Sequence, residues 1–176
     1  MKGVIFTEFL DMVEQVFSAD MVDDLIGATN PPSQGAYTAV GTYAHEEIVA
    51  MVVELSQRSG MPVPDLLEAF GTHLFARFSR LYPTLMPAAT SSLDFLETIE
   101  AIIHVQVLKL YPDAQLPRLE GVRHSDTHLT LEYRSPRGMQ DLAVGLIKGC
   151  GNHFGESLDI VSTEAYGGFD FEIRRV

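Results

Sequence analysis

The sequence predicts an α+β fold in which a helical N-terminal part is followed by an antiparallel sheet of about four strands with one helix inserted. Two patterns lead to this prediction. Up to residue 110, apolar residues recur every three or four positions, which is the period of an amphipathic helix. After Pro117, apolar and polar residues alternate in short runs bounded by turn-forming residues, which is the period of a strand.

The chain has 176 residues, 46% of them hydrophobic, and a mean hydropathy of +0.10. A chain of this size is long enough for one domain with a sizeable core and too short for two full domains, so we expect residues 1–176 to fold as a single domain. No run approaches eighteen apolar residues, and no basic segment precedes an apolar one. The sequence therefore predicts neither a membrane span nor a secretory leader.

Twelve Lys and Arg against twenty-four Asp and Glu give a formal net charge of -12. This charge disfavours nucleic acid and anionic membranes as partners, whereas a basic patch on a protein partner would be attracted. Cys150 is the only cysteine, so an intrachain disulfide is excluded and a cytoplasmic location is the simplest interpretation. We expect Cys150 itself to be a small buried hydrophobe rather than a redox group.

Four helices are expected before residue 83, and the first three cover residues 2–17, 20–28 and 45–59. Gly60 suits a left-handed cap at the end of the third helix. The fourth helix begins in the turn that contains Pro64 and ends before Pro83. Gly71 within it lowers helix stability but allows a neighbouring segment to approach closely.

Ser91 and Asp94 predict the capping box of a fifth helix that runs to residue 110 or 111 and ends before Pro112. Apolar residues surround this helix widely, so we expect burial on more than one side. The helix carries His104, and a buried imidazole needs partners for its ring nitrogens; a carbonyl or a water is expected to take one N–H. By itself, a histidine on a mostly apolar helix is more often a hydrogen-bonded core residue than a metal ligand.

The sheet is expected to consist of two hairpins separated by a helix at about residues 139–153. In the first hairpin, a turn at 124–126 joins strands at 119–123 and 127–135. In the second, a turn at 165–168 joins strands at 157–163 and 169–174. Alternation in the last strand places three residues on the inward face: Phe169, Phe171 and Ile173.

The other titratable groups give no pattern typical of a catalytic or metal site. Adjacent acids at 23–24 and 46–47 point apart on a helix, so we expect them on solvated faces and assign no catalytic residue. The remaining histidines lack metal-ligand spacing with acids or cysteine and are expected at the surface or in caps: His45, His73, His124, His128 and His153.

Tyr133, Ser135 and Arg137 continue the strand face that Leu129 and Leu131 mark as buried. Each of the three can donate a hydrogen bond to oxygen, and the arginine fork suits a carboxylate bidentately. The pattern therefore predicts a ligand with one or two carboxylates and an apolar body, a description that haem fits. An ordinary strand end that pairs with a nearby acid is the alternative.

The spacing Tyr-x-Ser-x-Arg resembles the propionate-binding motif of the H-NOX family, the haem-nitric oxide/oxygen-binding domains that also begin soluble guanylate cyclase subunits. Further features stand in the family's order: Met1-Lys2-Gly3, a helical His104, Pro117 and Gly145-Leu146-Ile147. The resemblance covers residues 1–176 and is to stand-alone bacterial members. It implies haem b between the helical part and the sheet, with His104 as the iron ligand and Tyr133, Ser135 and Arg137 at the propionates.

Carried over position by position, the resemblance also implies the surroundings of the haem. Around the haem it places Ile5, Phe78, Pro117 and Leu146, and around the gas-binding position it places Phe9, Leu74 and Leu142. Family members that hold oxygen carry a tyrosine at the place of Leu142. Iron-bound oxygen gains from a hydrogen-bond donor, whereas nitric oxide and carbon monoxide need one far less. We therefore expect nitric oxide and carbon monoxide to bind and oxygen to be excluded.

The resemblance implies a signalling mechanism as well. Nitric oxide on the iron weakens or breaks the bond to His104, so the helix can shift and a haem distorted by Ile5 and Pro117 can relax. The chain reaches Val176 without kinase, cyclase or phosphodiesterase machinery, so we expect it to regulate a separate protein: a histidine kinase, as in two-component signalling, or an enzyme that makes or degrades cyclic di-GMP.

Three other functions are compatible with the sequence. A haem enzyme would require a polar group for acid-base chemistry, which Phe9, Leu74 and Leu142 do not supply. A haem-free binding module would use Tyr133, Ser135 and Arg137 for another carboxylate, such as a fatty acid or a bilin, and would not need His104. A haem carrier would release haem readily to another protein.

Overall fold

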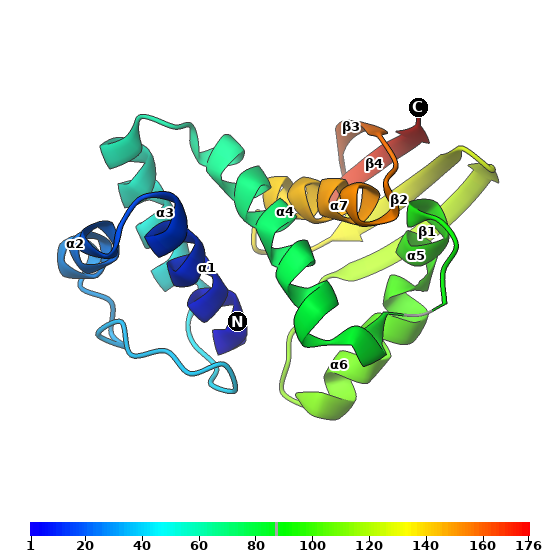
Figure 1. The fold of residues 1–176 in the computed structure, drawn as a ribbon. Helices are drawn as coiled ribbons and strands as arrows, with labels where there is room; N and C mark the ends of the chain where they lie inside the picture. The colour runs from blue at the N-terminus through cyan, green and yellow to red at the C-terminus, as the bar shows by residue number, and fades with distance from the viewer. Residues whose placement is uncertain (87) are drawn as a thin grey trace.

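The computed structural model of the chain describes residues 1–86 and 88–176 and confirms the α+β class (Figure 1). The helical part contains α1 (Gly3–Val16), α2 (Ala19–Thr29), α3 (His45–Ser59) and α4 (Val63–Leu81), followed by a short 3-10 turn at Pro83–Leu85. Next come α5 (Ser92–Thr98), the π-helical segment η2 (Ile99–His104) and α6 (Val105–Leu110). The sheet region comprises β1 (Arg118–Ser125), β2 (His128–Arg134), α7 (Gln140–Phe154), β3 (Leu158–Ala165) and β4 (Gly168–Arg175).

Local signals explain several helix ends. The side chains of Ser18 and Ser91 accept hydrogen bonds from the backbone N–H groups three residues on, at 3.1 and 3.2 Å, and so cap α2 and α5. Gly60 ends α3 in the left-handed conformation with φ of 74°, as the sequence predicts. No helix among the described residues is long and apolar enough to cross a bilayer.

In the described residues, four strands form one antiparallel sheet in the order β1-β2-β4-β3. The inward alternation expected for the last strand is confirmed, because Phe171 and Ile173 are fully buried and lie opposite Leu131 and Leu129 of β2. Tyr133 lies opposite Phe169 on the same face. The motif strand therefore lies in the middle of the sheet, with its Leu and Tyr residues towards the helices.

The buried residues form two hydrophobic clusters, one within α1 to α4 and one between α5, α7 and the sheet. In Figure 1, α1, α2 and α3 lie to one side of α4, while α7 lies between α4 and the sheet. Leu146 contacts both clusters. The fold thus consists of two packed regions that meet along α4 and α7.

Glycines allow α4 and α7 to approach closely. A Cβ atom on Gly71 would lie 2.3 Å from the carbonyl oxygen of Leu142, and one on Gly145 would lie 2.1 Å from that of Glu68. The close approach expected at Gly71 is therefore confirmed, and Gly145 supplies its counterpart on α7. At the same crossing, Thr72 Oγ1 donates to the carbonyl oxygen of Gly145 at 3.1 Å. This contact fixes the position of α7 relative to the helical part.

The segment after Ser91 departs from the single buried helix that the sequence predicts. It is interrupted by the π-helical turns of η2, and apolar side chains on its outer side are about two-fifths exposed: Ile102, Val105 and Leu108. The expectation of burial on more than one side is therefore wrong. Helical periodicity shows which faces of a helix are apolar. It does not show whether another element packs against each of those faces.

Two further expectations have different outcomes. Cys150 is fully buried, its Sγ lies 3.7 Å from the carbonyl oxygen of Ser92, and burial raises the pKa of its thiol, so the expected buried hydrophobe is confirmed. The solvated face expected for residues 46–47 is wrong for Glu47. Its carboxylate is buried and accepts hydrogen bonds from the hydroxyls of Ser33 and Tyr37 at 2.5 and 2.9 Å.

Replacing Gly145 with Ala tests the contact between α4 and α7. The added methyl group meets backbone atoms of Glu68, so we expect the free energy of unfolding to fall by about 1–3 kcal/mol, measured by urea denaturation. Gly27 on α2 is the matched control because a Cβ there meets nothing within 4 Å. Gly27→Ala should raise the free energy of unfolding by up to about 1 kcal/mol. Equal stability of the two variants would contradict the contact.

Candidate functional site

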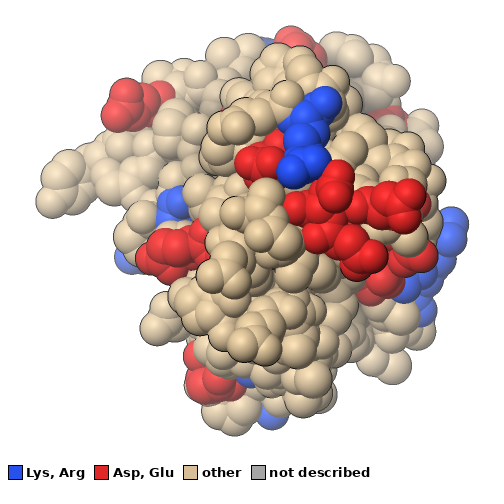
Figure 2. Space-filling view, turned by 90° about the vertical axis from the view of Figure 1, so that its left-hand side faces the viewer, with Lys and Arg blue, Asp and Glu red and all other residues tan. Residues whose placement is uncertain are grey.

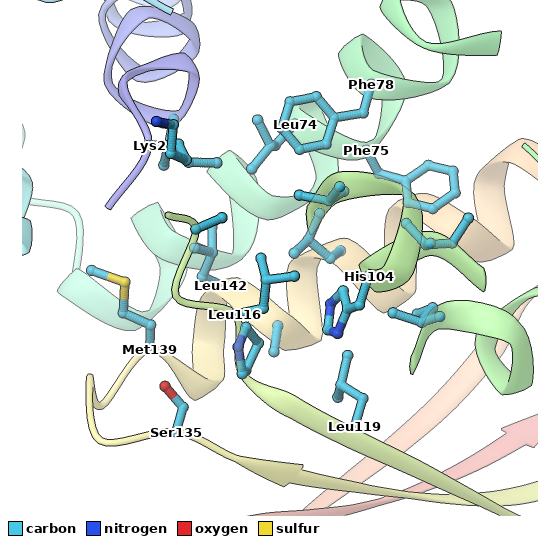
Figure 3. A pocket seen from close by; sticks show the side chains of 18 of the residues that line it. Lys2, Leu74, Phe75, Phe78, His104, Leu116, Leu119, Ser135, Met139 and Leu142 are labelled. Carbon is cyan, nitrogen blue, oxygen red and sulfur yellow. The ribbon is translucent and has the colours of Figure 1, made fainter. Parts of the chain in front are cut away.

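A cavity of about 330 Å3 lies where the two hydrophobic clusters meet. Its walls come from α1, α4, the helical segment that contains His104, the loop before β1, the end of β2 and the first half of α7 (Figure 3). Most of the lining is apolar, with a few polar side chains near the end of β2. A deep apolar site with few polar groups is typical of pockets that hold a small molecule or a cofactor.

The structure brings together almost all residues that the sequence predicts for the site. The cavity wall includes ten of them: Ile5, Leu74, Phe78, His104, Pro117, Tyr133, Ser135, Arg137, Leu142 and Leu146. They come from elements up to 141 residues apart in the sequence, from Ile5 to Leu146, so their convergence is a property of the fold rather than of local spacing.

Phe9 is the residue that the structure places elsewhere. Its side chain is fully buried within the helical cluster and packs edge-to-face on Phe70, with ring centroids 5.3 Å apart. Ile5, one turn earlier on α1, lines the cavity, whereas Phe9 is not part of its wall. Phe9 thus lies in the core between α1 and α4, and its place at the gas-binding position stays a prediction.

His104 lies at the end of the π-helical segment, and its imidazole points into the cavity beside Leu116 and Leu119 (Figure 3). Its Nδ1 atom lies 3.0 Å from the Glu100 carboxylate, which also accepts the backbone N–H of Leu119 at 3.0 Å. A carboxylate accepts only, so we assign the proton to Nδ1, which leaves the lone pair of Nε2 free. A neutral imidazole held in this way is a ready metal ligand.

Glu100 is a residue that the sequence analysis missed. The expected partner of the imidazole was a carbonyl or a water, and the structure supplies a carboxylate four residues earlier instead. An acid four residues before a histidine on the same helix lies on the same face, so the sequence contains a weak indication of this contact. Its second bond, to Leu119, depends on the tertiary fold and has no signal in the sequence.

The polar end of the cavity is formed by the Tyr133, Ser135 and Arg137 motif. Burial raises the pKa of Tyr133, while a hydrogen bond with Ser135 and the charge of Arg137 act in the opposite direction. Figure 3 shows the hydroxyl of Ser135 pointing towards the cavity. All three side chains thus present groups that can donate hydrogen bonds near one end of the cavity.

Arg137 carries a charge that is not neutralised by an ion pair. Its guanidinium donates to the backbone carbonyl and side-chain oxygens of Gln115, at 2.7 and 3.2 Å, and in the described part of the chain it forms no ion pair with a carboxylate. The alternative interpretation, in which Arg137 pairs with a nearby acid at the end of the strand, is therefore not observed among the described residues. Two of its five N–H groups are used, so a carboxylate of a ligand can be accepted.

Lys2 joins the two sides of the cavity. Its ammonium group lies 2.8 Å from the Thr42 hydroxyl and 3.2 Å from the Asp113 carboxylate, and 5.1 Å from the centroid of the Tyr111 ring. Hydrogen bonds from Thr42 and Lys2 hold the pKa of Asp113 below its usual value. The start of the chain is thereby attached to the loop that leads to Pro117.

The cavity wall also contains the apolar side chains predicted for the gas-binding position, Leu74 and Leu142. Tyr82 also lines the cavity, which the sequence analysis did not anticipate. Burial and a hydrogen bond with Tyr111 raise the pKa of Tyr82 to about 12. Its hydroxyl therefore keeps its proton at neutral pH.

Outside the cavity the surface is acidic, in line with the net charge of -12. On the face formed by the N-terminal helices, acidic side chains gather in one group with few basic ones beside them (Figure 2). Some of this charge is neutralised locally, because Arg58 pairs with Asp24 and Glu54, both at 2.7 Å. A basic partner surface would be attracted to this face.

A protein-family model described as haem-NO-binding matches residues 2–162 of the chain. An H-NOX protein from K. algicida, solved in the Fe(II) unliganded state, is 36% identical, with a TM-score of 0.93 over 100% of this chain and 97% of that chain. An H-NOX protein from S. oneidensis in the Fe(II)NO ligation state is 27% identical, with a TM-score of 0.93 over 100% and 99%. The S. oneidensis domain in the Fe(II)CO ligation state is 27% identical, with a TM-score of 0.90 over 100% of this chain and 99% of that chain. No curated protein sequence matches the chain.

Proposed function

Because the chain belongs to the haem-NO-binding (H-NOX) family, we propose that its cavity holds haem b as a gas sensor for nitric oxide and carbon monoxide. The single observation that carries the proposal is the orientation of His104. Its imidazole points into an apolar cavity with Nδ1 held by Glu100, and the unpaired charge of Arg137 stands at the polar end of the same cavity.

The residues of the cavity fit this cofactor. His104 would bind the iron, while Tyr133, Ser135 and Arg137 would bind the propionates. Ile5, Phe78, Pro117 and Leu146 supply apolar wall for the macrocycle, and we retain Ile5 and Pro117 as the residues that press on it. The only cysteine, Cys150, is buried outside the cavity wall, which supports a haem without thioether bonds to the protein. The iron would supply the position at which the gas binds.

We propose that the protein discriminates against oxygen. Leu74 and Leu142, the side chains predicted for the gas-binding position, offer no hydrogen-bond donor. Oxygen on iron gains from such a donor because it carries partial negative charge, whereas nitric oxide and carbon monoxide depend on it far less. Phe9 has no part in this argument, since it lies in the helical core.

Release of His104 is the proposed signal. The segment from η2 to α6 packs mainly through its cavity side, so a change in the tether at His104 can shift the whole segment. Its outer apolar side chains are accessible to a partner protein. We propose a separate signalling enzyme as that partner, either a histidine kinase or an enzyme of cyclic di-GMP metabolism.

Replacing His104 with Gly tests the role of the histidine. The variant should lose the iron-histidine band in resonance Raman spectra of the reduced protein, and millimolar imidazole should restore an iron-nitrogen band by occupying the vacated space. If the protein is instead a haem-free carboxylate-binding module, His104 has no role in binding. The His104→Gly variant and the wild type would then give the same spectra, with or without imidazole.

Replacing Arg137 with Ala tests the polar end. Loss of a charge-assisted hydrogen bond should weaken haem binding by about 1.5–3 kcal/mol, measured from the rate of haem transfer to apomyoglobin. Arg134 is the matched control, because it pairs with Glu132 and Asp170 and does not line the cavity. Equal haem loss from Arg137→Ala and the wild type would contradict the propionate role.

Replacing Glu100 with Gln tests how His104 is held. The amide oxygen can still accept the N–H of Leu119, but it accepts from the imidazole more weakly than a carboxylate, so the imidazole becomes a poorer electron donor. The iron-histidine stretching frequency should therefore fall. Glu120→Gln removes the same charge from an exposed position on β1 and should leave the frequency unchanged; the same frequency in Glu100→Gln would contradict the role of Glu100.

A further inference from the structure

Two histidines and a glutamate meet on the face of the sheet that points away from the cavity. On β2, His128 alternates with the buried Leu129 and Leu131, so its side chain lies on the outer face with Thr130. Glu172 of β4 lies opposite Thr130 in register and shares that face. His124 is the extra residue of a β-bulge in β1, between Arg123 and Ser125, and its side chain joins the same group.

The side-chain atoms are close enough to share one ion. One ligand atom from each of His124, His128 and Glu172 can be chosen so that all lie within 4.8 Å of one another. The two imidazole rings lie 4.5 Å apart at an angle of 34°, and His128 Nε2 lies 2.5 Å from a Glu172 oxygen. Thr130 connects the third member, since its hydroxyl oxygen lies 2.6 Å from His124 Nε2 and 2.7 Å from the other Glu172 oxygen.

We propose that His124, His128 and Glu172 form a zinc site on the outer face of the sheet, independent of the haem cavity. Two imidazoles and one carboxylate are a known zinc ligand set, with metal-ligand distances of about 2.0–2.2 Å. In tetrahedral geometry these bond lengths separate the ligand atoms by roughly 3.3 Å. Small side-chain rotations from the observed positions achieve this, and a fourth position remains open to solvent.

The backbone holds the three ligands in place without the metal. They come from three neighbouring strands, β1, β2 and β4. Ladder pairing fixes the Cβ positions of His128 and Glu172, and the paired residues on both sides of the bulge hold His124. The hydroxyl of Thr130 donates to one carboxylate oxygen of Glu172 at 2.7 Å and so helps to fix the orientation of this side chain. Thr130 would remain beside Glu172 as an outer partner that orients this carboxylate.

The proposal departs from the sequence-based expectation that no histidine outside position 104 binds metal. His124 and His128 lie on opposite sides of a tight turn, and Glu172 follows 44 residues after His128. The spacing of the three residues in the sequence therefore does not indicate a metal site. The bulge at His124 brings its side chain to the outer face, and bulges cannot be read from alternation of apolar and polar residues. Imidazole ligands suit Zn2+ and also Cu2+, which tends to bind such sites more tightly when it is available.

Zinc titration of the full-length protein, with its haem content measured beforehand, tests the site. Isothermal titration calorimetry should give one equivalent of Zn2+ for the wild type. The variants His128→Ala and Glu172→Gln should weaken binding by about tenfold or more. His45→Ala is the matched control: His45 also lies near a carboxylate, 3.3 Å from Glu46, and its loss should not change the affinity.

A second measurement separates this site from zinc bound elsewhere. Zinc should raise the thermal midpoint of the wild type and not that of the double variant His124→Ala/His128→Ala, because the ion links three strands only when both imidazoles are present. Because the three ligands lie on the outer face of the sheet, we expect the variants to keep their fold. Circular dichroism checks this for each variant. Absence of binding up to millimolar zinc, or equal binding by the wild type and the double variant, would overturn the proposal.

Discussion

The carboxylate of Glu100 holds both the imidazole of His104 and the backbone N–H of Leu119, and the orientation of the proposed iron ligand depends on this pair of hydrogen bonds. The helical segment around His104 has exposed apolar residues on its outer side, so few contacts other than those of the cavity side keep it in place. A histidine whose release is the proposed signal benefits from such an arrangement. It is oriented well enough to bind metal, yet its segment is packed loosely enough to move when the bond is lost.

The cavity itself depends on how the two hydrophobic clusters are joined. Gly71 and Gly145 allow α4 and α7 to touch through their backbones, and the first half of α7 then carries Leu142 and Leu146 to the cavity wall. Lys2 and Asp113 connect the start of the chain with the loop before β1 on another side. Tyr133, Ser135 and Arg137 form a polar end of the cavity, where Arg137 has no ion pair with any described carboxylate. The cavity therefore suits a cofactor with an apolar body, which the apolar wall would contact, and acidic substituents, which Arg137 and its neighbours would bind.

The sequence predicted the fold class, the inward face of the last strand and the close approach at Gly71, because period and glycine chemistry are local properties. The motif of Tyr133, Ser135 and Arg137 and the position of His104 carried the resemblance, and the structure places all four on one cavity. Glu47 and the exposed side of the His104 helix were predicted wrongly, since burial depends on which elements pack together. Glu100, Tyr82 and the cluster around His128 were missed because tertiary pairing or a bulge brings their partners near.

The most direct test of the account is the absorption spectrum of the reduced, haem-loaded protein under argon, then in air, then with nitric oxide. The account predicts a five-coordinate ferrous spectrum that does not change when oxygen is admitted and that converts completely when nitric oxide is added. A stable oxygen complex at ambient oxygen would contradict the proposed selectivity and would identify Tyr82, the hydroxyl that lines the cavity, as the first donor to remove. Failure to bind haem even after reconstitution would remove the proposed role of His104 altogether.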